Sequence, residues 1–268
     1  MRYDVNLSIL FTELPLLRRA EAARAAGFAA VEFWWPFEAA APGDREVDAF
    51  VRSVADAGVY LACLNFFAGS MPSGDRGLFS WIGRQRELAD SVDIAVGIAQ
   101  RLGCRTFNAL YGNRVESQDP AAQDEHALST LDSAATAAAR IGSGLVVEPL
   151  SGVGRYPLRL AADALAVLDK LGRDNVSLLC DIYHLAVNGD DIDVVIAGHT
   201  GRIGHVQIAD APGRHQPGTG RLDIPGYLRK LGDAGYRGHV GLEYVPEGPS
   251  TESFEWLSQL TRCCPDAT

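Results

Sequence analysis

Short apolar runs rich in β-branched residues alternate along the chain with longer Ala- and Leu-rich stretches of helical periodicity. This alternation is typical of repeated strand-helix units around a parallel sheet. The pattern predicts strands at 3–9, 29–33, 59–65, 104–109, 144–148, 176–181, 203–208 and 239–243. It predicts helices at 15–26, 45–57, 84–102, 121–141, 160–171, 190–197, 224–234 and 251–261.

Glycine follows six of the predicted helices, which supports the count of units. A residue just past a helix end often adopts a left-handed backbone conformation, which glycine reaches without steric cost. The six are Gly27, Gly58, Gly103, Gly142, Gly172 and Gly235. No linker, charge block or low-complexity segment interrupts the alternation. The pattern therefore predicts a single domain over residues 1–268, folded as a (β/α)8 TIM barrel.

The longest predicted connections all follow strands. In a barrel of this type such loops lie on the active face. They span residues 66–83, 110–120, 149–159 and 209–222, and they contain polar and turn-forming residues.

The chain carries a formal net charge of −10 and has a sequence pI near 5.0. It has no cluster of lysine and arginine that would bind a nucleic-acid backbone, so nucleic acid is not an expected partner. No segment approaches the roughly 20 apolar residues of a membrane span. We therefore expect a cytoplasmic protein that does not enter membranes and that acts on a small molecule.

Five cysteines occur in the chain, an odd number without paired spacing. Cys63, Cys104 and Cys180 lie in or beside apolar strand runs, which predicts buried free thiols in a reducing compartment. Cys263 and Cys264 are adjacent near the C-terminus, where we expect a frayed tail. None of the five is assigned a chemical role.

Four polar side chains share one position, the end of a predicted strand, in the second half of the chain. Glu148 ends GLVVE, Asp181 ends VSLLCD, Gln207 ends RIGHVQ and Glu243 ends GHVGLE. In a (β/α)8 barrel these strand ends meet at the mouth, where the chemistry is placed. Three carboxylates and one amide oxygen suit a hard divalent cation such as Mg²⁺, Mn²⁺ or Co²⁺ and leave positions open for substrate. The alternative for each residue taken alone is a side chain that caps the next helix.

Glu148 and Glu243 end the fifth and eighth predicted strands, which face each other across the barrel mouth. Two carboxylates on opposite sides of a substrate can remove a proton from one carbon and return a proton to its neighbour. This is the chemistry of an aldose-ketose isomerase or an epimerase. The chain lacks G-x-S-x-G, H-E-x-x-H and C-x-x-C motifs, which disfavours serine hydrolysis and a structural zinc site.

Three further side chains near the mouth have two interpretations each. His184 follows Asp181 by three residues, and it either polarises a substrate oxygen or only caps a helix. His205 lies one layer deeper than Gln207 on the same strand face, which favours a core histidine over a ligand. Arg214 either binds a substrate carboxylate or a row of hydroxyls, or it lies in a surface loop.

Seven segments spread over nearly the whole chain match the sequence motifs of a known family: LFTELPLL, AGFAAVEFWWPFE, LNFFAGSMPSGDRG, EPL, CDIYH, GHVQIADAPGRHQPGTG and GLEYVP. On these segments the chain resembles the hydroxypyruvate isomerase family, which includes 2-oxo-tetronate isomerases, within the xylose-isomerase-like TIM barrels. The resemblance implies that the divalent-metal ligands are Glu148, Asp181, Gln207 and Glu243. It also implies that Glu148 and Glu243 transfer the proton and that His184 and Arg214 contact substrate. Related ketose 3-epimerases carry a histidine in place of Gln207, which favours the hydroxypyruvate branch.

Some positions depart from the family pattern. Ser151 replaces the usual Asn after EPL, Gln216 replaces a usual Glu, and Arg221 replaces the acid of PGTGE. The segment LAVNGDD after CDIYH also lacks the usual Gln. Two fewer acids and one more cation near the mouth indicate a substrate that is more anionic than the family norm, or differently shaped.

We therefore expect an isomerase that converts hydroxypyruvate or a related short 2-oxo-3-hydroxy acid through an enediolate, with Arg214 at the acid end. The rival enzymes are a ketose 3-epimerase and an inosose-type dehydratase, which share the fold and the metal. A sugar-binding barrel without catalysis is a further alternative, although the four retained ligands argue against it. The aromatic residues of the first loops pack in the core, line the mouth or contact a second copy in a homo-oligomer; they are Phe33, Trp34, Trp35, Phe66 and Phe67.

Overall fold

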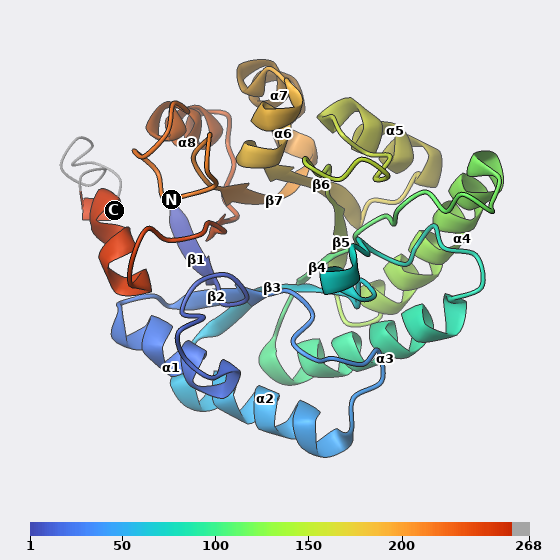
Figure 1. Ribbon diagram of the computed structural model, residues 1–268, viewed down its shortest axis with the longest axis horizontal. Helices are drawn as coiled ribbons and strands as arrows, with labels where there is room; N and C mark the ends of the chain where they lie inside the picture. The colour runs from blue at the N-terminus through green and yellow to red at the C-terminus, as the bar shows by residue number, and fades with distance from the viewer. Residues whose placement is uncertain (259–268) are drawn as a thin grey trace.

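The computed structural model describes residues 1–258 and contains a closed barrel of eight parallel strands (Figure 1). The strands are β1 (Arg2–Asn6), β2 (Ala30–Phe33), β3 (Tyr60–Asn65), β4 (Thr106–Asn108), β5 (Gly144–Val147), β6 (Val176–Asp181), β7 (Ile203–Ile208) and β8 (His239–Leu242). Each strand pairs with the next one along the chain, and β8 pairs with β1 to close the barrel. The predicted (β/α)8 TIM barrel is confirmed, and each predicted strand lies within a few residues of the observed one.

The helices surround the strands (Figure 1). They are α1 (Leu16–Ala25), α2 (Asp44–Ala57), α3 (Gln85–Leu102), α4 (Pro120–Ala139), α5 (Ala161–Leu171), α6 (Ile182–Asn188), α7 (Ile192–His199) and α8 (Ile224–Asp233), with shorter 3-10 helices η1 (Met71–Ser73), η2 (Thr200–Arg202) and η3 (Ser250–Phe254). None of the helices in the described residues is both long enough and apolar enough to cross a membrane. Cys263, Cys264 and the end of the predicted helix at 251–261 lie outside the described residues.

The sequence pattern missed helix α6, which begins directly after β6. The pattern placed one helix at 190–197, whereas the structure has α6 and then α7 in this part of the chain. Asp181 accounts for the early start, because its side chain accepts hydrogen bonds from the backbone N–H groups of Tyr183 and His184. Gly189 ends the helix in the left-handed conformation after seven residues. A helix this short has too few turns to show a hydrophobic periodicity.

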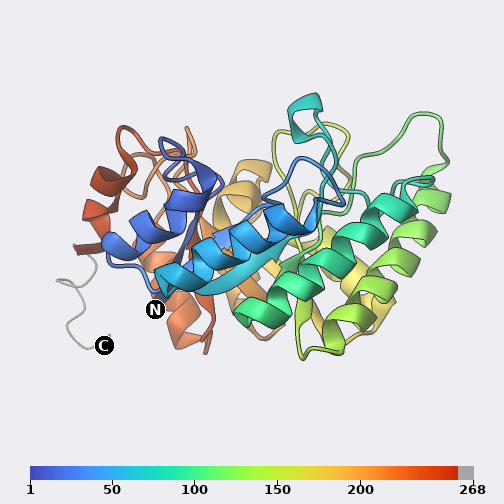
Figure 2. The ribbon, with the colours of Figure 1, turned by 90° about the horizontal axis from the view of Figure 1, so that it is seen from below.

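The six glycines expected past helix ends all have positive φ values, as predicted. The connections that follow strands β3, β4, β5 and β7 lie together on one side of the barrel (Figure 2). This side is the C-terminal end of the strands. The long loops therefore surround the mouth where the candidate chemistry is placed.

Side chains along β7 alternate between the barrel interior and the layer beneath the helices. His205 and Gln207 point into the interior, where both contact Glu32 of β2. Val206 and Ile208 belong to the buried apolar core. The apolar core therefore stabilises the wall of the barrel, while polar groups gather in its interior.

Gly241 of β8 makes room for one of these polar groups. A Cβ atom built at this position would lie 2.6 Å from Oε1 of Glu32, well inside van der Waals contact. The carboxylate of Glu32 therefore crosses the interior toward a strand position that only glycine can occupy without a shift.

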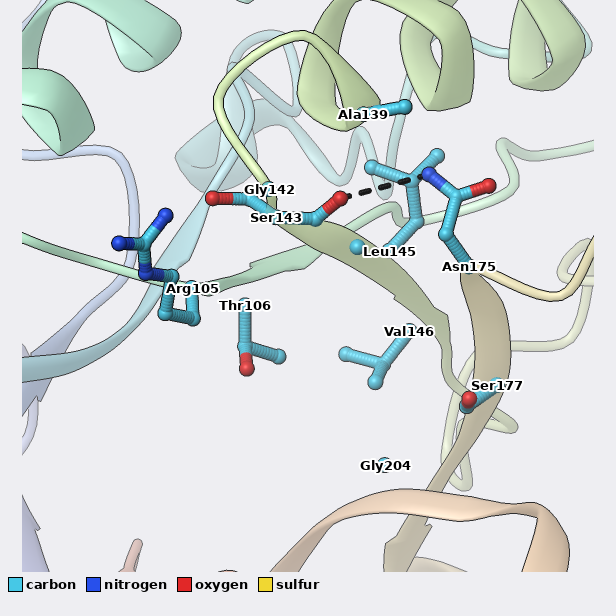
Figure 3. Close-up of a pocket in the computed structure, with 11 residues that line it drawn as sticks. Arg105, Thr106, Ala139, Gly142, Ser143, Leu145, Val146, Asn175, Ser177 and Gly204 are labelled. Carbon is cyan, nitrogen blue, oxygen red and sulfur yellow. Dashed lines mark hydrogen bonds between the residues drawn. The ribbon is translucent and has the colours of Figure 1, made fainter.

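A hollow of about 370 Å³ lies on the opposite side of the barrel from the mouth, and Figure 3 shows residues that line it. It is lined by residues near the N-terminal ends of β4 to β7, including Thr106 and Gly144. Its larger polar side chains already have protein partners: Asn175 donates to the carbonyls of Ala135 and Ser143, and Arg105 donates to that of Ile141. The hollow therefore lacks the converging free polar groups of a ligand site.

We predict that Gly241→Ala destabilises the protein by about 1–3 kcal/mol, because the added methyl group pushes against Glu32 in a packed interior. Gly198→Ala on α7 is the matched control, since a Cβ there would meet nothing within 4 Å. Thermal unfolding of both variants measures the effect. Equal midpoints for Gly241→Ala and the wild type would contradict the tight placement of Glu32.

Candidate active site

A hollow of about 180 Å³ lies at the C-terminal ends of the strands. Its wall includes Trp34, Arg76, Glu148, His184, Arg214 and Glu243. These residues come from six different parts of the chain, and the barrel closure brings them together. The sequence placed four of them near the mouth, and Trp34 among the aromatic residues that pack in the core, line the mouth or contact a second copy.

Glu148 and Asp181 lie close together with His184. One ligand atom from each lies within 4.8 Å of the others, and all three side chains are buried. Asn108 of β4 donates to Oε2 of Glu148 at 2.6 Å. Oδ1 of Asp181 caps α6, whereas its Oδ2 is buried and has no hydrogen-bond partner. Two of the four predicted metal ligands, Glu148 and Asp181, therefore lie close together, with His184, a predicted substrate contact, beside them.

Gln207 stands beside Asp181 in the barrel wall, because the two residues are register partners on β7 and β6. Its Nε2 donates to Oε1 of Glu32 at 2.8 Å. Since a carboxylate can only accept, the amide nitrogen must face Glu32 and the amide oxygen must point away from it. That oxygen is buried and has no hydrogen-bond partner. Asp181 and Gln207 thus each present one unpartnered oxygen.

Glu243 follows β8, and both of its oxygens already have partners. Oε1 accepts from Asn6 Nδ2 at 3.0 Å and from Trp34 Nε1. Oε2 accepts from Arg214 Nη2 at 2.9 Å. Within the described residues, Glu243 does not join the close group formed by Glu148 and Asp181. It lines the same hollow as Glu148.

Burial and acidic neighbours raise the pKa values of two acids at the mouth, Glu148 and Glu243. Burial, then Glu243 and then Asp181 raise the pKa of Glu148 well above its usual range. Burial raises the pKa of Glu243 to about 7, although Arg214 opposes this shift. Burial lowers the pKa of His184 to about 4 despite the neighbouring Asp181 carboxylate, so this imidazole is neutral near pH 7. A cluster of buried acids of this kind is stabilised by a bound cation.

The tautomer of His184 follows from its contact with Ser151. The backbone N–H of Ser151 donates to Nδ1 at 3.0 Å, so Nδ1 is the acceptor and Nε2 carries the proton. Nε2 lies 3.6 Å from Oδ2 of Asp181. Ser151, one of the departures from the family pattern, therefore orients the histidine.

Beneath the mouth, Glu32 holds a buried network. Its Oε1 accepts from Asn6 and Gln207, and its Oε2 lies 2.6 Å from Nε2 of His205. Burial lowers the pKa of His205, but the adjacent Glu32 carboxylate outweighs this and raises it to about 9. His205 is therefore a charged partner of Glu32 in the core, in line with the interpretation favoured from the sequence. Asp4 is buried beside this pair, and burial followed by Glu32 raises its pKa.

Several residues of this site were not identified from the sequence, namely Asn6, Glu32, Arg76 and Asn108. Asn6 ends β1, Asn108 ends β4, and Glu32 lies near the end of β2. The strand-end rule that found the four predicted ligands therefore also applied to the first half of the barrel. Arg76 lies in a loop, where no such rule exists.

The other residues named from the sequence, two departures from the family pattern and the aromatic residues of the first loops, lie in different environments. Arg221 is exposed, and Gln216 accepts a hydrogen bond from the backbone of Glu247. Trp34 reaches the mouth, whereas Phe33, Phe66 and Phe67 are buried in the core.

The three cysteines within the described residues, Cys63, Cys104 and Cys180, are buried free thiols, as predicted. Burial raises the pKa of each, which disfavours a reactive thiolate.

Comparison with known proteins gives the same picture of the fold. A family model described as xylose isomerase-like TIM barrel matches residues 20–260. A Streptomyces coelicolor protein, provisionally named a hydroxypyruvate isomerase, is 51% identical over 265 residues, which cover 96% of this chain and 95% of the relative. A 2-oxo-tetronate isomerase of Cupriavidus necator is 32% identical over 96% of this chain and 97% of its own length. A crystal structure titled AP endonuclease, family 2, from Brucella melitensis has a TM-score of 0.88 and 33% identity, and the match covers 96% of this chain and 98% of that one.

We predict that Glu148→Gln stabilises the metal-free protein at pH 7.5. A carboxylate whose pKa is raised by folding destabilises the folded state above its unfolded pKa, and the neutral amide removes that penalty. The midpoint of thermal unfolding should rise by about 2–4 °C for each kcal/mol regained. The difference should shrink as the pH falls toward 4, where the glutamate is protonated in both states. A lower midpoint for the variant at pH 7.5 would show that repulsion among the acids is not significant.

Proposed function

Since the chain belongs to the xylose isomerase-like TIM barrel family and to its hydroxypyruvate isomerase branch, we propose that it interconverts a short 2-oxo-3-hydroxy acid and the corresponding 2-hydroxy-3-oxo isomer. Hydroxypyruvate is the simplest such acid. The net reaction moves one proton from C3 to C2 and one proton from the oxygen on C3 to the oxygen on C2. No atom is gained or lost.

The observation that carries this proposal is the pair of buried, unpartnered oxygens of the neighbouring residues Asp181 and Gln207, with the Asp181 carboxylate close to that of Glu148. A buried polar atom without a partner is costly, and oxygen donors are what a hard divalent cation requires. The residues present therefore fit such a cation, with Glu148, Asp181, Gln207 and Glu243 as its proposed ligands. When bound, the cation would polarise the substrate carbonyl and make the adjacent C–H more acidic.

Glu148 and Glu243 form the proposed proton-transferring pair. They follow β5 and β8, which are separated in the barrel by β6 and β7, and both line one hollow, so that a substrate in the hollow would contact both. One glutamate takes the proton from C3 as the enediolate forms, and the other delivers a proton at C2.

His184 and Arg214 are the proposed contacts to substrate oxygens. His184 carries its proton on Nε2 and is neutral, so it donates a hydrogen bond without bringing a charge. Arg214 donates to Glu243, packs over the Tyr183 ring and has a buried Nε without a partner. This arrangement leaves a donor for a substrate oxygen while the guanidinium holds Glu243 in place.

The experiment is an activity panel with hydroxypyruvate, 2-oxo-tetronates and free ketoses, run with and without Mg²⁺, Mn²⁺ or Co²⁺. We expect turnover of at least one 2-oxo-3-hydroxy acid, its loss after treatment with EDTA, and its recovery on adding the cation. Epimerised ketose or dehydrated product, with the oxo acids unchanged, would favour the rival enzymes instead.

In the same assay, Glu148→Gln and Glu243→Gln should each lower kcat by a factor of about 10² or more, the contribution of one acid-base group. Glu125→Gln, an exposed acid on α4, is the control that changes charge away from the mouth. Activity of either mouth variant equal to that of the control would remove that glutamate from the proton transfer.

A further inference from the structure

The mouth contains two arginines whose charges are balanced differently. Arg214 forms an ion pair with Glu243 at 2.9 Å. Arg76, from the loop after β3, donates only through Nη1, to the backbone carbonyls of Met71 at 3.0 Å and Asp75 at 2.7 Å. Within residues 1–258, no carboxylate forms an ion pair with Arg76, although its side chain lines the hollow. Its Nε and Nη2 groups therefore have no protein acceptor in that part of the chain.

The acid next to Arg76 in the sequence is not available to it. Oδ2 of Asp75 accepts from the backbone N–H of Ser70 at 2.8 Å and from Arg84 Nη1 at 3.1 Å. Arg84 also bonds Glu87, so the loop uses its own acids to hold Arg84 rather than Arg76. The charge of Arg76 is left facing the mouth.

The loop holds Arg76 in a fixed position. Gly77 has a φ of 104°, and a Cβ there would lie 1.8 Å from the carbonyl oxygen of Leu110, so this residue must be glycine for the two loops to pack. Asn113 donates to the carbonyl of Gly74 at 2.8 Å and ties the loops together on the other side of Arg76. A guanidinium whose backbone is already ordered loses little entropy when it binds an anion.

The charges of the mouth balance only with an anionic ligand. A divalent cation and Arg214 together carry three positive charges, which match the carboxylates of Glu148, Asp181 and Glu243. His205 neutralises Glu32 in the interior. The positive charge of Arg76 then needs one negative charge from the substrate.

We infer that Arg76 binds the carboxylate of the substrate and selects 2-oxo acids over neutral sugars. The inference rests on the proposed function and names the residue that holds the acid end, a role that the sequence pattern gave to Arg214. The Nε and Nη2 edge of a guanidinium matches a carboxylate through two parallel hydrogen bonds. The hollow of about 180 Å³ is smaller than the roughly 300–1,000 Å³ of drug-sized pockets, which suits an acid of three or four carbons.

The test compares hydroxypyruvate with dihydroxyacetone, its neutral counterpart in which a hydroxymethyl group replaces the carboxylate. In the metal-loaded enzyme, Arg76→Gln should raise KM for hydroxypyruvate about 10- to 100-fold, the usual range for a lost charge-assisted pair. kcat should change much less, because Arg76 is proposed to hold the carboxylate and takes no part in the proton transfer between C3 and C2. The inhibition constant of dihydroxyacetone should stay unchanged, since this ligand has no carboxylate.

Arg86→Gln, an exposed position on α3, is the control that removes one positive charge without touching the mouth. Arg76→Lys should give an intermediate KM, because it keeps the charge but loses the paired geometry. Thermal unfolding shows whether Arg76→Gln folds. If it does not, Arg76→Lys tests the role of Arg76 in its place. The expected KM for hydroxypyruvate is then about 10-fold higher than that of the Arg86→Gln control.

Two outcomes would overturn the role of Arg76 while the proposed function stands. One is a KM for hydroxypyruvate that Arg76→Gln leaves unchanged, while the wild-type enzyme turns this acid over. The other is a weakening of dihydroxyacetone binding equal to that of hydroxypyruvate, which would indicate only a structural role for the loop. A wild-type enzyme that converts ketoses and no 2-oxo acid would instead overturn the proposed function, and this inference with it.

Discussion

The buried carboxylate of Glu32 is the group on which the geometry of the barrel mouth depends. It accepts hydrogen bonds from Asn6 and Gln207 and is paired with His205. Because it can only accept, it fixes the amide of Gln207 with the oxygen turned away. Asn6 extends the same network to Glu243. Without Glu32, the amide of Gln207 would be free to present either its oxygen or its nitrogen to the mouth.

The fold bears an electrostatic cost in order to build this site. Three buried carboxylates lie at the mouth, and two of them, Glu148 and Glu243, line the hollow. The pKa of Glu148 rises because burial and its acidic neighbours disfavour the charged form. The apolar layer between the strands and the helices supplies the stability that offsets this cost. The proposed cation would remove most of the repulsion, and the substrate would bring the remaining negative charge.

The sequence predicted the barrel and the four strand-end ligand candidates because both depend on local patterns. Apolar periodicity identifies strands and helices, and a polar residue at a strand end stands out against the run before it. The Glu32 network could not be predicted in this way, since its partners Gln207 and Asn6 are distant in the sequence and meet only when the barrel closes. Helix α6 was missed because its seven residues are too few to show a hydrophobic periodicity. Arg76 was missed because it stands out only through having no carboxylate partner among the described residues, which no sequence pattern shows.

A crystal structure of the protein soaked in Mn²⁺, with anomalous diffraction to locate the ion, tests the central claim most directly. We expect one Mn²⁺ at the mouth, with oxygens of Glu148, Asp181, Gln207 and Glu243 at about 2.0–2.6 Å, the range for hard cations with oxygen ligands. Glu243 must move toward the close group for this to occur. An ion bound elsewhere, a nitrogen of Gln207 facing the mouth, or two of these side chains separated by more than about 10 Å, far beyond ligand distances, would contradict a shared site.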